Sequence, residues 1–484
     1  MSDRIQKTKD ALDGVSPSFC LAKWLQVTIH LQNGRTHSCH HPSTHHIPLV
    51  EIQQKPSALH NTEFKKSVQD EMIDGTRPSE CQYCWNVEDL PGDHTSDRIM
   101  KSADSGWAGK DEVDRVVAAH KQGKEVNPSY VEVSFSNVCN FKCSYCSPVH
   151  SSRWVNEIET HGAYQLGGRE YNGLEWFKES KSMPIHHKEH NPYVEAFWEW
   201  WPDLSKDLKV FRITGGEPLL DVNTFKVLDF LNEQPNPNME FSVNSNLCVP
   251  NDKIDSYISK MKLLIDGGKI RRHVMYTSVD GHGKQAEYGR NGLDYVTWIY
   301  NVDKILTELP TTKITIMCTT NIFSITSMEK LLRDVYNLKI KHRNKDRNVP
   351  LTIDMSILRW PAHQCAAILP EHYADLLTPA LEFMEDHSEL REKDEPWKGF
   401  FAPSELFFAY EVEKLKRFIE FLKQPPNKNE GVSVEKSMQE FYLFVNEHDK
   451  RRGTNFLETF PELEGFYRDC ENIAKNRIDM IEVK

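Results

Sequence analysis

The sequence contains no run of 18 or more apolar residues, and its first ten residues, MSDRIQKTKD, include no apolar signal region. It also has no excess of basic residues, because 59 Lys and Arg stand against 71 Asp and Glu, a net charge of −12. These absences exclude a membrane-spanning helical protein and argue against a general nucleic-acid binder, although a local basic groove is compatible with them. We expect a cytoplasmic protein.

Internal repeats of solenoid period and low-complexity tracts are also absent. With 39% hydrophobic and 27% charged residues over 484 positions, the composition is that of a folded chain of about two to three domains. In a cytoplasmic protein, 11 cysteines are more typical of metal ligands or reactive thiols than of disulfides.

The middle of the chain, residues 129–370, carries short β-rich runs separated by helical patterns. After the first run, the others start roughly 30 to 40 residues apart, which is typical of repeated β-α units around a parallel sheet or barrel. We therefore predict an α/β fold with a partial (β/α)6 barrel. The six runs are Tyr130–Phe135, Val210–Thr214, Phe241–Asn244, His273–Val279, Ile314–Thr319 and Leu351–Ile357.

Four zones follow from this pattern. Residues 1–105 are rich in Cys and His, residues 106–128 form a charged linker helix, residues 129–370 form the barrel, and residues 371–484 are helical. The ends of the β-rich runs carry small polar residues or glycine, and chemistry in parallel barrels sits where the strands end. The functional residues are therefore expected in the loops that follow the strands.

A loop with three cysteines follows the first predicted strand. Cys139, Cys143 and Cys146 have the spacing C-x3-C-x2-C. Three thiolates can hold a four-iron cluster with one iron left open for a small molecule. The alternatives are a chance cluster of cysteines or a zinc site, but zinc needs a fourth ligand and no second C-x-x-C follows at finger spacing.

This loop resembles the signature of radical S-adenosylmethionine (SAM) enzymes. In that family the open iron of a 4Fe–4S cluster chelates the methionine end of SAM, and an aromatic residue at the position of Tyr145 contacts the adenine. One β-α unit later, Gly215, Gly216 and Glu217 resemble the GGE segment that holds the SAM amine. Glycine suits such a site because the backbone can approach a ligand without a Cβ in the way.

Two further segments resemble the family in the expected order. Asn246 ends the third strand, where relatives carry an Asn-Gly turn near the ribose, but this chain has Leu247 in place of the glycine. Ser278, followed by Val279-Asp280-Gly281, and then Arg290 resemble the S-x-D-G…R arrangement. The resemblance implies that Arg290 pairs with the SAM carboxylate, which suits a guanidinium fork. A turn and a surface arginine are the alternative.

Four more cysteines lie in the N-terminal zone. Residues 25–32 alternate between apolar and polar, Asn33-Gly34 predicts a hairpin turn, and residues 35–39 form the return strand. Cys20 and Cys39 flank this hairpin, and Cys81 and Cys84 add a chelating pair roughly forty residues later. Four thiolates make a closed iron–sulfur site. A four-cysteine zinc knuckle is the alternative, and a mixed site could draw on the histidines at 37, 40, 41, 45 and 46.

The pattern C-x13-G-x4-C followed by C-x2-C resembles the twitch domain, the short form of the SPASM auxiliary iron–sulfur domain. In relatives this module follows the barrel, whereas here it precedes it. The resemblance implies a radical SAM enzyme that receives an electron from a donor such as flavodoxin or ferredoxin and abstracts hydrogen from a substrate, with a peptide or partner protein as the first choice. The alternatives are a dehydrogenase or epimerase of a sugar or nucleotide, and a non-catalytic scaffold that holds iron–sulfur or zinc sites.

Overall fold

The computed structural model describes residues 3–92, 94–104, 106–343, 349–388, 406–424 and 433–482, with backbone alone for 477–482. The chain forms two compact units, and neither is continuous in sequence. The first unit comprises Met1–Val138, Ser182–Val243 and Leu263–His273; the second comprises Cys139–Lys181, Asn244–Lys262 and Val274–Lys484. Within the described residues, the helices are all too short or too polar to cross a membrane.

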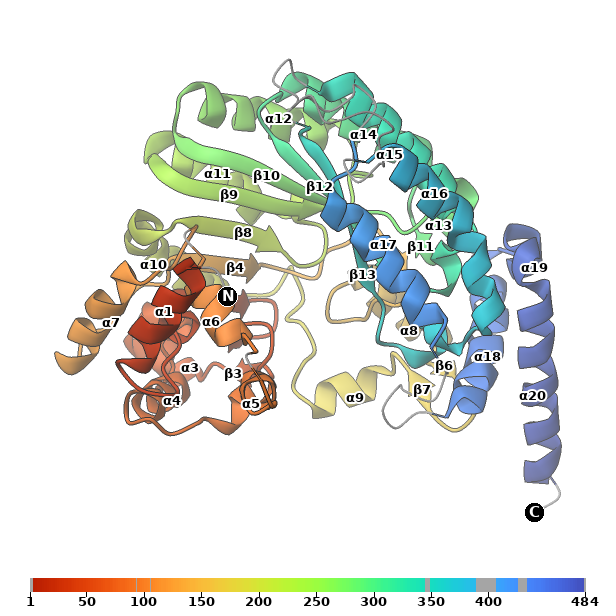
Figure 1. Cartoon of the computed structure of the whole chain (residues 1–484), viewed down its shortest axis with the longest axis horizontal. Coiled ribbons are helices and arrows are strands. Elements are labelled where there is room, and N and C mark those ends of the chain that lie inside the picture. Colours follow the sequence, from red (N-terminus) through yellow and green to blue (C-terminus); the bar gives the residue numbers. More distant parts are fainter. Residues whose placement is uncertain are drawn as a thin grey trace. The chain divides into compact units, whose positions relative to one another are not determined.

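The fold is mixed α/β, with parallel strands that alternate with helices (Figure 1). In the first unit, β4 (Tyr130–Ser134), β8 (Val210–Thr214) and β9 (Asn236–Ser245) are neighbouring parallel strands. Strand β10 (Ile270–Ser278) contributes residues to both units, and it is parallel to β12 (Lys313–Thr320), which is parallel to β13 (Leu351–Ile357). These are the six β-rich runs that the sequence predicts.

The predicted hairpin is present in the first unit. Strands β1 (Gln26–His30) and β2 (Arg35–His37) pair antiparallel, and Gly34 in the turn has φ +64°. Strand β3 (His45–His46) pairs antiparallel with β2. Strand β1 also pairs in parallel with β4, so the N-terminal hairpin extends the sheet of the first unit. That pairing places Val27 and Ile29 beside buried valines of β4 on the apolar face of the sheet.

The helices of the first unit cover the hairpin and the strands. An apolar cluster that includes Leu12, Trp24, Met72, Trp85 and Val116 joins the N-terminal helices into one core. The helices are α1 (Asp3–Asp13), α2 (Ala22–Leu25), α3 (Leu49–Gln54), α4 (Glu63–Ile73), α5 (Gln82–Glu88), α6 (Asp97–Ser102), α7 (Asp111–Lys121), α10 (Pro192–Asp207) and α11 (Val222–Glu233).

The second unit holds two short strand pairs and most of the remaining helices. The pairs are β5 (Lys142–Cys143) with β11 (Arg290–Asn291), and β6 (Tyr164–Gln165) with β7 (Glu170–Tyr171). Helix α12 (Asn251–Asp266) contributes residues to both units. The other helices are α8 (Ser152–His161), α9 (Leu174–Glu179), α13 (Gly283–Gly289), α14 (Tyr295–Glu308), α15 (Met328–His342), α16 (Thr378–Asp386), α17 (Ala409–Leu422), α18 (Val434–Arg452), α19 (Phe456–Thr459) and α20 (Glu464–Glu482).

The C-terminal region is helical, as predicted, and it packs through aromatic side chains. Helices α18 and α20 run side by side (Figure 1), with ring contacts from Phe441 to Phe466 at 5.1 Å and from Tyr442 to Tyr467 at 5.4 Å. Helix α17 joins this region to α15 through Lys339 and Glu411, whose side chains are both fully buried and 2.7 Å apart. The C-terminal helices therefore form part of the second unit's core.

Candidate cofactor site

The three-cysteine loop lies in the second unit, where a short strand pair fixes its middle. Strand β5 contains Cys143 and pairs antiparallel with β11, so that Arg290 lies directly opposite Cys143. The Cys146 N–H donates to the Cys143 carbonyl at 2.9 Å, which closes a turn between these two cysteines. The Phe141 N–H points to the Cys139 sulfur at 3.4 Å. The three cysteines thus belong to one tight loop, and all three are half-buried.

A buried ion pair stands beside this loop. The Asp280 carboxylate accepts two hydrogen bonds from Arg290, from Nε at 2.8 Å and from Nη2 at 3.0 Å. It accepts two more, from the Tyr145 hydroxyl at 2.7 Å and from the Thr319 backbone N–H at 2.8 Å. The remaining guanidinium nitrogen, Nη1, lies 3.7 Å from the Cys143 sulfur. Asp280 therefore orients Arg290 toward the cysteine loop.

The surroundings of the loop control the protonation of its thiols. Burial raises the pKa of Cys143, and the Arg290 guanidinium opposes that rise. Burial also raises the pKa of Cys146, to about 12, and the neighbouring Cys143 adds to it. Both groups are therefore thiols in the metal-free chain. Metal binding has to displace their protons, and a cation beside Cys143 favours that exchange.

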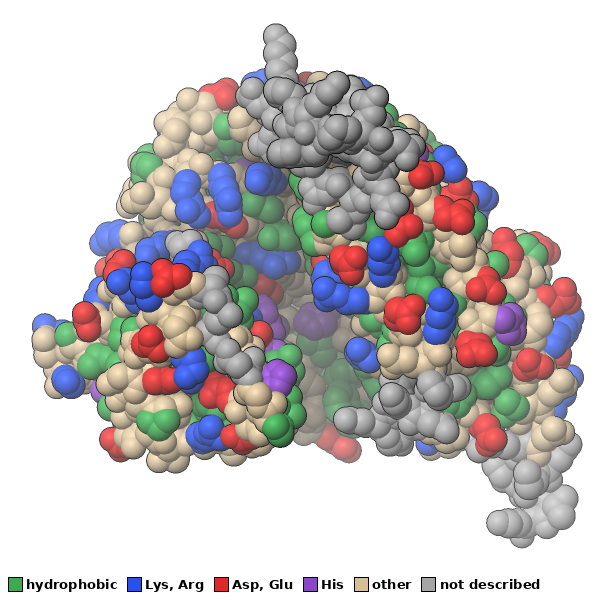
Figure 2. Space-filling view, viewed as in Figure 1, with side chains coloured by type: hydrophobic (Ala, Val, Ile, Leu, Met, Phe, Trp, Pro, Cys, Tyr) green, Lys and Arg blue, Asp and Glu red, His purple; other side chains and the backbone are tan. Residues whose placement is uncertain are grey.

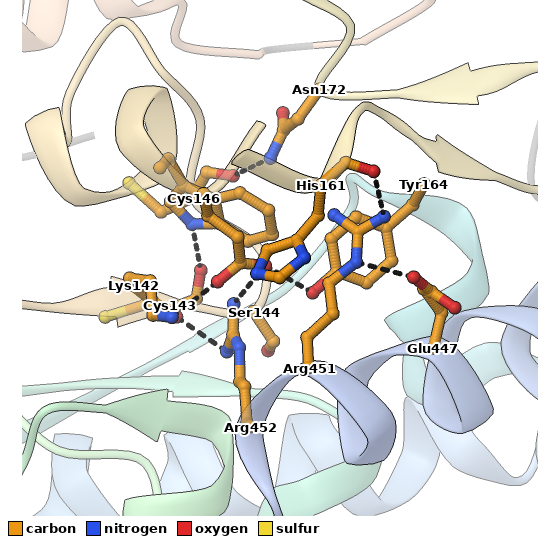
Figure 3. A network of polar contacts seen from close by, with 12 residues as sticks. Lys142, Cys143, Ser144, Cys146, His161, Tyr164, Asn172, Glu447, Arg451 and Arg452 are labelled. Atoms are coloured by element: carbon orange, nitrogen blue, oxygen red, sulfur yellow. Dashed lines mark hydrogen bonds and ion pairs between the residues drawn. The ribbon is translucent and has the colours of Figure 1, made fainter. Parts of the chain in front are cut away.

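A second layer of contacts holds the loop backbone (Figure 3). Arg452, at the end of α18, donates to the Lys142 carbonyl at 2.9 Å, and the Asn172 side chain donates to the Cys146 carbonyl at 2.9 Å. The Trp154 indole donates to the Cys143 carbonyl at 2.9 Å. Gln364 contacts Ser144 twice, accepting from its hydroxyl at 2.7 Å and donating to its carbonyl at 3.1 Å. Segments far apart in the sequence therefore set the shape of the loop.

Asn246 also reaches the cysteine loop. Its side chain donates to Asn140 Oδ1 at 2.8 Å and accepts from the Cys248 N–H at 2.9 Å, while Asn140 donates to the Cys248 carbonyl at 2.8 Å. Between them, Leu247 has φ +56° and is fully buried. A left-handed conformation favours glycine, which explains why an Asn-Gly turn suits this position. Ser278 ends β10, two residues before Asp280.

The Gly-Gly-Glu segment lies in the first unit, after β8. A Cβ on Gly215 would collide with the Ser134 side chain, and one on Gly216 would collide with the Val138 carbonyl. The Glu217 N–H donates to that same carbonyl at 2.7 Å, and its carboxylate accepts from the Leu219 N–H at 3.0 Å. Both glycines are therefore required by the close approach of two backbone segments, and Glu217 caps the short helix η3 (Pro218–Leu220).

The four N-terminal cysteines line a single pocket of the first unit. Cys20, Cys39, Cys81 and Cys84 share it with Lys23, Arg98 and several other side chains. Burial raises the pKa of Cys81 and of Cys84 to about 12, and the charges of Cys20 and Cys39 add to both shifts. The four sulfurs thus lie close enough to influence one another's ionisation, and the structure brings together the residues that the hairpin pattern singled out.

Neither thiol set has the geometry of a site closed around one ion. Among the residues that the structure describes, no three His, Cys, Asp or Glu side chains are placed to hold a single metal ion. A four-iron cluster binds its cysteines on separate irons, so it needs several soft donors around one space rather than around one point. The four N-terminal cysteines line one such space, and the three cysteines of the loop supply soft donors from one short segment. The nature of the metal at either place stays a prediction.

Sequence reasoning missed several residues that shape the site. Asp280 was part of a recognised motif, but its role as acceptor for both Arg290 and Tyr145 depends on the pairing of β5 with β11. Arg452 and Gln364 carry no local signal, because their contacts with the loop span 310 and 220 positions of the chain. Only a tertiary contact could have identified them.

Three solved structures are similar to this chain in fold, at low sequence identity. No family model and no curated protein matches the sequence. Streptococcus suis SuiB bound to S-adenosylmethionine is similar at 12% identity and a TM-score of 0.33, over 78% of this chain and 71% of that one. The SuiB complex with the precursor peptide SuiA gives 10% identity and a TM-score of 0.31, over 74% and 69%.

A third solved structure, native anSMEcpe with bound AdoMet, is similar at 16% identity and a TM-score of 0.30. The match covers 52% of this chain and 58% of anSMEcpe, so this chain spans less than two thirds of that protein's length. Identities and TM-scores this low carry no argument about function. The functional interpretation therefore depends on the residues of this chain.

Proposed function

We propose that the chain is a radical SAM enzyme that binds a 4Fe–4S cluster through Cys139, Cys143 and Cys146. The observation that carries this proposal is the position of Arg290, which lies opposite Cys143 with its guanidinium 3.7 Å from the sulfur. A cation at that distance favours the thiolate, the form in which cysteine binds iron. Three soft donors and one oriented cation suit an anionic cluster with an open iron.

The chain's own residues have a positioning role in the proposed reaction. A bound cluster would supply one electron to SAM, and cleavage of the C5′–S bond would then give methionine and a 5′-deoxyadenosyl radical. Asp280 fixes the Arg290 guanidinium, and the Tyr145 ring lies 5.5 Å from it. Burial holds the pKa of Tyr145 well above its usual range, so its hydroxyl stays protonated and donates to Asp280.

A second iron–sulfur centre on Cys20, Cys39, Cys81 and Cys84 is part of the proposal. Its closed set of four thiols favours electron transfer over direct substrate binding. We expect a donor such as flavodoxin or ferredoxin, and a peptide or partner protein as substrate. On the face drawn in Figure 2, basic and acidic side chains are interspersed, and the net charge is −12. That charge makes a polyanionic substrate a less suitable choice.

The proposal is tested by anaerobic reconstitution with iron and sulfide, followed by dithionite and SAM. The product to measure is 5′-deoxyadenosine. Cys143→Ala should abolish it, whereas Cys470→Ala, a buried cysteine of α20, should leave it near the wild-type level. If the intact protein binds only zinc and produces no 5′-deoxyadenosine, the proposal is wrong and the chain is a non-catalytic metal-binding scaffold.

A further inference from the structure

Helix α6 contacts the four-cysteine pocket of the first unit, although it contains no cysteine. Three of its side chains, Asp97, Arg98 and Lys101, line the pocket together with the cysteines. Arg98 is only 3% exposed. Because burial removes the hydration of a guanidinium, a buried arginine contributes less through its charge than through the directed hydrogen bonds that it makes.

The backbone on both sides of Cys20 is bonded to α6. Arg98 Nη1 donates to the Phe19 carbonyl at 2.9 Å, and the Leu21 N–H donates to Ser102 Oγ at 3.2 Å. Phe19, Leu21 and Ser102 are fully buried, so water does not compete for these two backbone groups. One helix therefore fixes the position of Cys20.

The same guanidinium holds the segment of Cys84. Glu88 is the last residue of α5, four positions after Cys84, and its carboxylate accepts from Arg98 Nε at 2.8 Å and from Nη2 at 3.3 Å. Asp13, at the end of α1, also accepts from Nη2, at 3.0 Å. The planar fork of Arg98 thus joins the segments of Cys20 and Cys84, which the single point charge of a lysine cannot do in the same way.

The segment of Cys39 meets α6 through His41. His41 Nε2 lies 2.7 Å from Asp97 Oδ2, within hydrogen-bonding distance. The His41 ring also stacks on Tyr83, which lies within the C-x2-C pair, with the ring centroids 3.7 Å apart. The segments that carry the four cysteines are therefore joined to α6 directly or through a residue that contacts it.

We propose that α6 fixes the spacing of Cys20, Cys39, Cys81 and Cys84 before metal binds, and that Arg98 is the positioning residue of the centre they hold. The inference rests on the second centre of the proposed function. Ligands that are already in place lose little conformational freedom on binding, so a pre-organised site holds its metal more tightly. Loss of the Arg98 bonds should therefore let the centre release its metal faster.

The test uses the full chain with Cys139, Cys143 and Cys146 all replaced by Ala, so that only the second centre binds iron. Iron, sulfide and zinc contents are measured after anaerobic reconstitution, and transfer of iron to a coloured chelator gives the rate of metal release. Arg98→Met should raise this rate at least about tenfold, the factor that corresponds to one charged hydrogen bond. Ser102→Ala removes one neutral bond beside Cys20 and should raise it about fivefold, which keeps the inference testable if the Arg98 variant does not fold.

Two control variants separate positioning from general stability. Arg77→Met removes an arginine that is 42% exposed and binds Asp89 at 2.7 Å at the surface, where solvent screens its charge. Leu231→Ala opens a cavity in the core of the same unit, at a fully buried residue of α11 that does not line the pocket. Both should change the release rate less than twofold, and an effect of Leu231→Ala equal to that of Arg98→Met would overturn the positioning role.

The EPR spectrum of the reduced centre is a readout that stability alone does not move. Arg98→Met should shift it, because the thiolates of Cys20 and Cys84 change orientation around the iron, whereas Leu231→Ala should leave it as in the background variant. If iron binds and neither Arg98→Met nor Ser102→Ala changes the release rate or the spectrum, the role of α6 is wrong and the second centre stands.

The remaining outcomes concern the metal itself. If the background variant binds zinc in place of iron, the iron–sulfur centre of the proposed function is wrong, and the rate of zinc release tests Arg98 with the same variants. If it binds neither metal, the second centre and the role of Arg98 are both wrong. None of these outcomes affects SAM cleavage at the three-cysteine loop, which the 5′-deoxyadenosine assay tests separately.

Discussion

The Asp280 carboxylate is the most informative position for testing the structure of the cysteine loop. Its two oxygens accept four hydrogen bonds, two of them from the buried Arg290 guanidinium. Asp280→Asn keeps the shape of the side chain but removes its charge and turns one acceptor into a donor. Breaking a buried ion pair while one charge remains costs about 3–5 kcal/mol. Tyr145→Phe removes one of the four donors and should cost about 1.5 kcal/mol.

Urea unfolding of the metal-free protein, followed by tryptophan fluorescence, measures these costs as shifts in the transition midpoint. Asp303→Asn is the matched control, because Asp303 is 27% exposed and pairs with Lys341 and His342 at the surface. Such a pair contributes at most about 1 kcal/mol. If Asp280→Asn cost no more than Asp303→Asn, Asp280 would not hold Arg290 in place, and the geometry proposed for the cysteine loop would be refuted.

Three further changes test the fold. Burial lowers the pKa of His273 to about 3, against about 6.5 in the unfolded chain, so protons bind the unfolded state first as the pH falls below 6.5. The free energy of unfolding of the wild-type chain should fall between pH 7.5 and 5.5, and in His273→Leu this fall should be smaller by about 1.4 kcal/mol. If urea unfolding showed the same pH dependence for both proteins, His273 would be protonated in the folded state. Leu247→Gly relieves about 1 kcal/mol of left-handed backbone strain, but it removes a fully buried side chain that contributes about 2–5 kcal/mol to stability. The thermal unfolding midpoint of this variant should therefore fall, and a rise would show that the strain is the larger of the two energies. Glu411→Gln should cost about 3–5 kcal/mol in urea unfolding, because Lys339 stays buried without a carboxylate to balance its charge. The double variant with Lys339→Met and Glu411→Leu should cost less, and a double variant less stable than the single one would contradict this assignment.

The sequence was sufficient to predict elements that depend on local patterns. Short β-rich runs at a regular spacing predicted the six parallel strands, and helical patterns predicted the C-terminal helices. The turn at Asn33-Gly34 followed from the φ > 0 preference of glycine. The parallel pairing of β1 with β4 was not predictable, since the alternation in residues 25–32 shows that a strand has a buried face and not which strand lies beside it.

The candidate site also combines features that local sequence patterns predicted with features that depend on tertiary contacts. Close cysteine spacing predicted the three-cysteine loop, and the hairpin pattern together with the C-x2-C pair predicted the four-cysteine group. The partners of those thiols were harder to predict. Asp280 and Arg290 reach the cysteine loop through β5 and β11, two strands of two residues each, which are too short to leave a period in the sequence. Helix α18 contributes Arg452 from 310 residues away, and its apolar face gave no reason to expect contact with the loop.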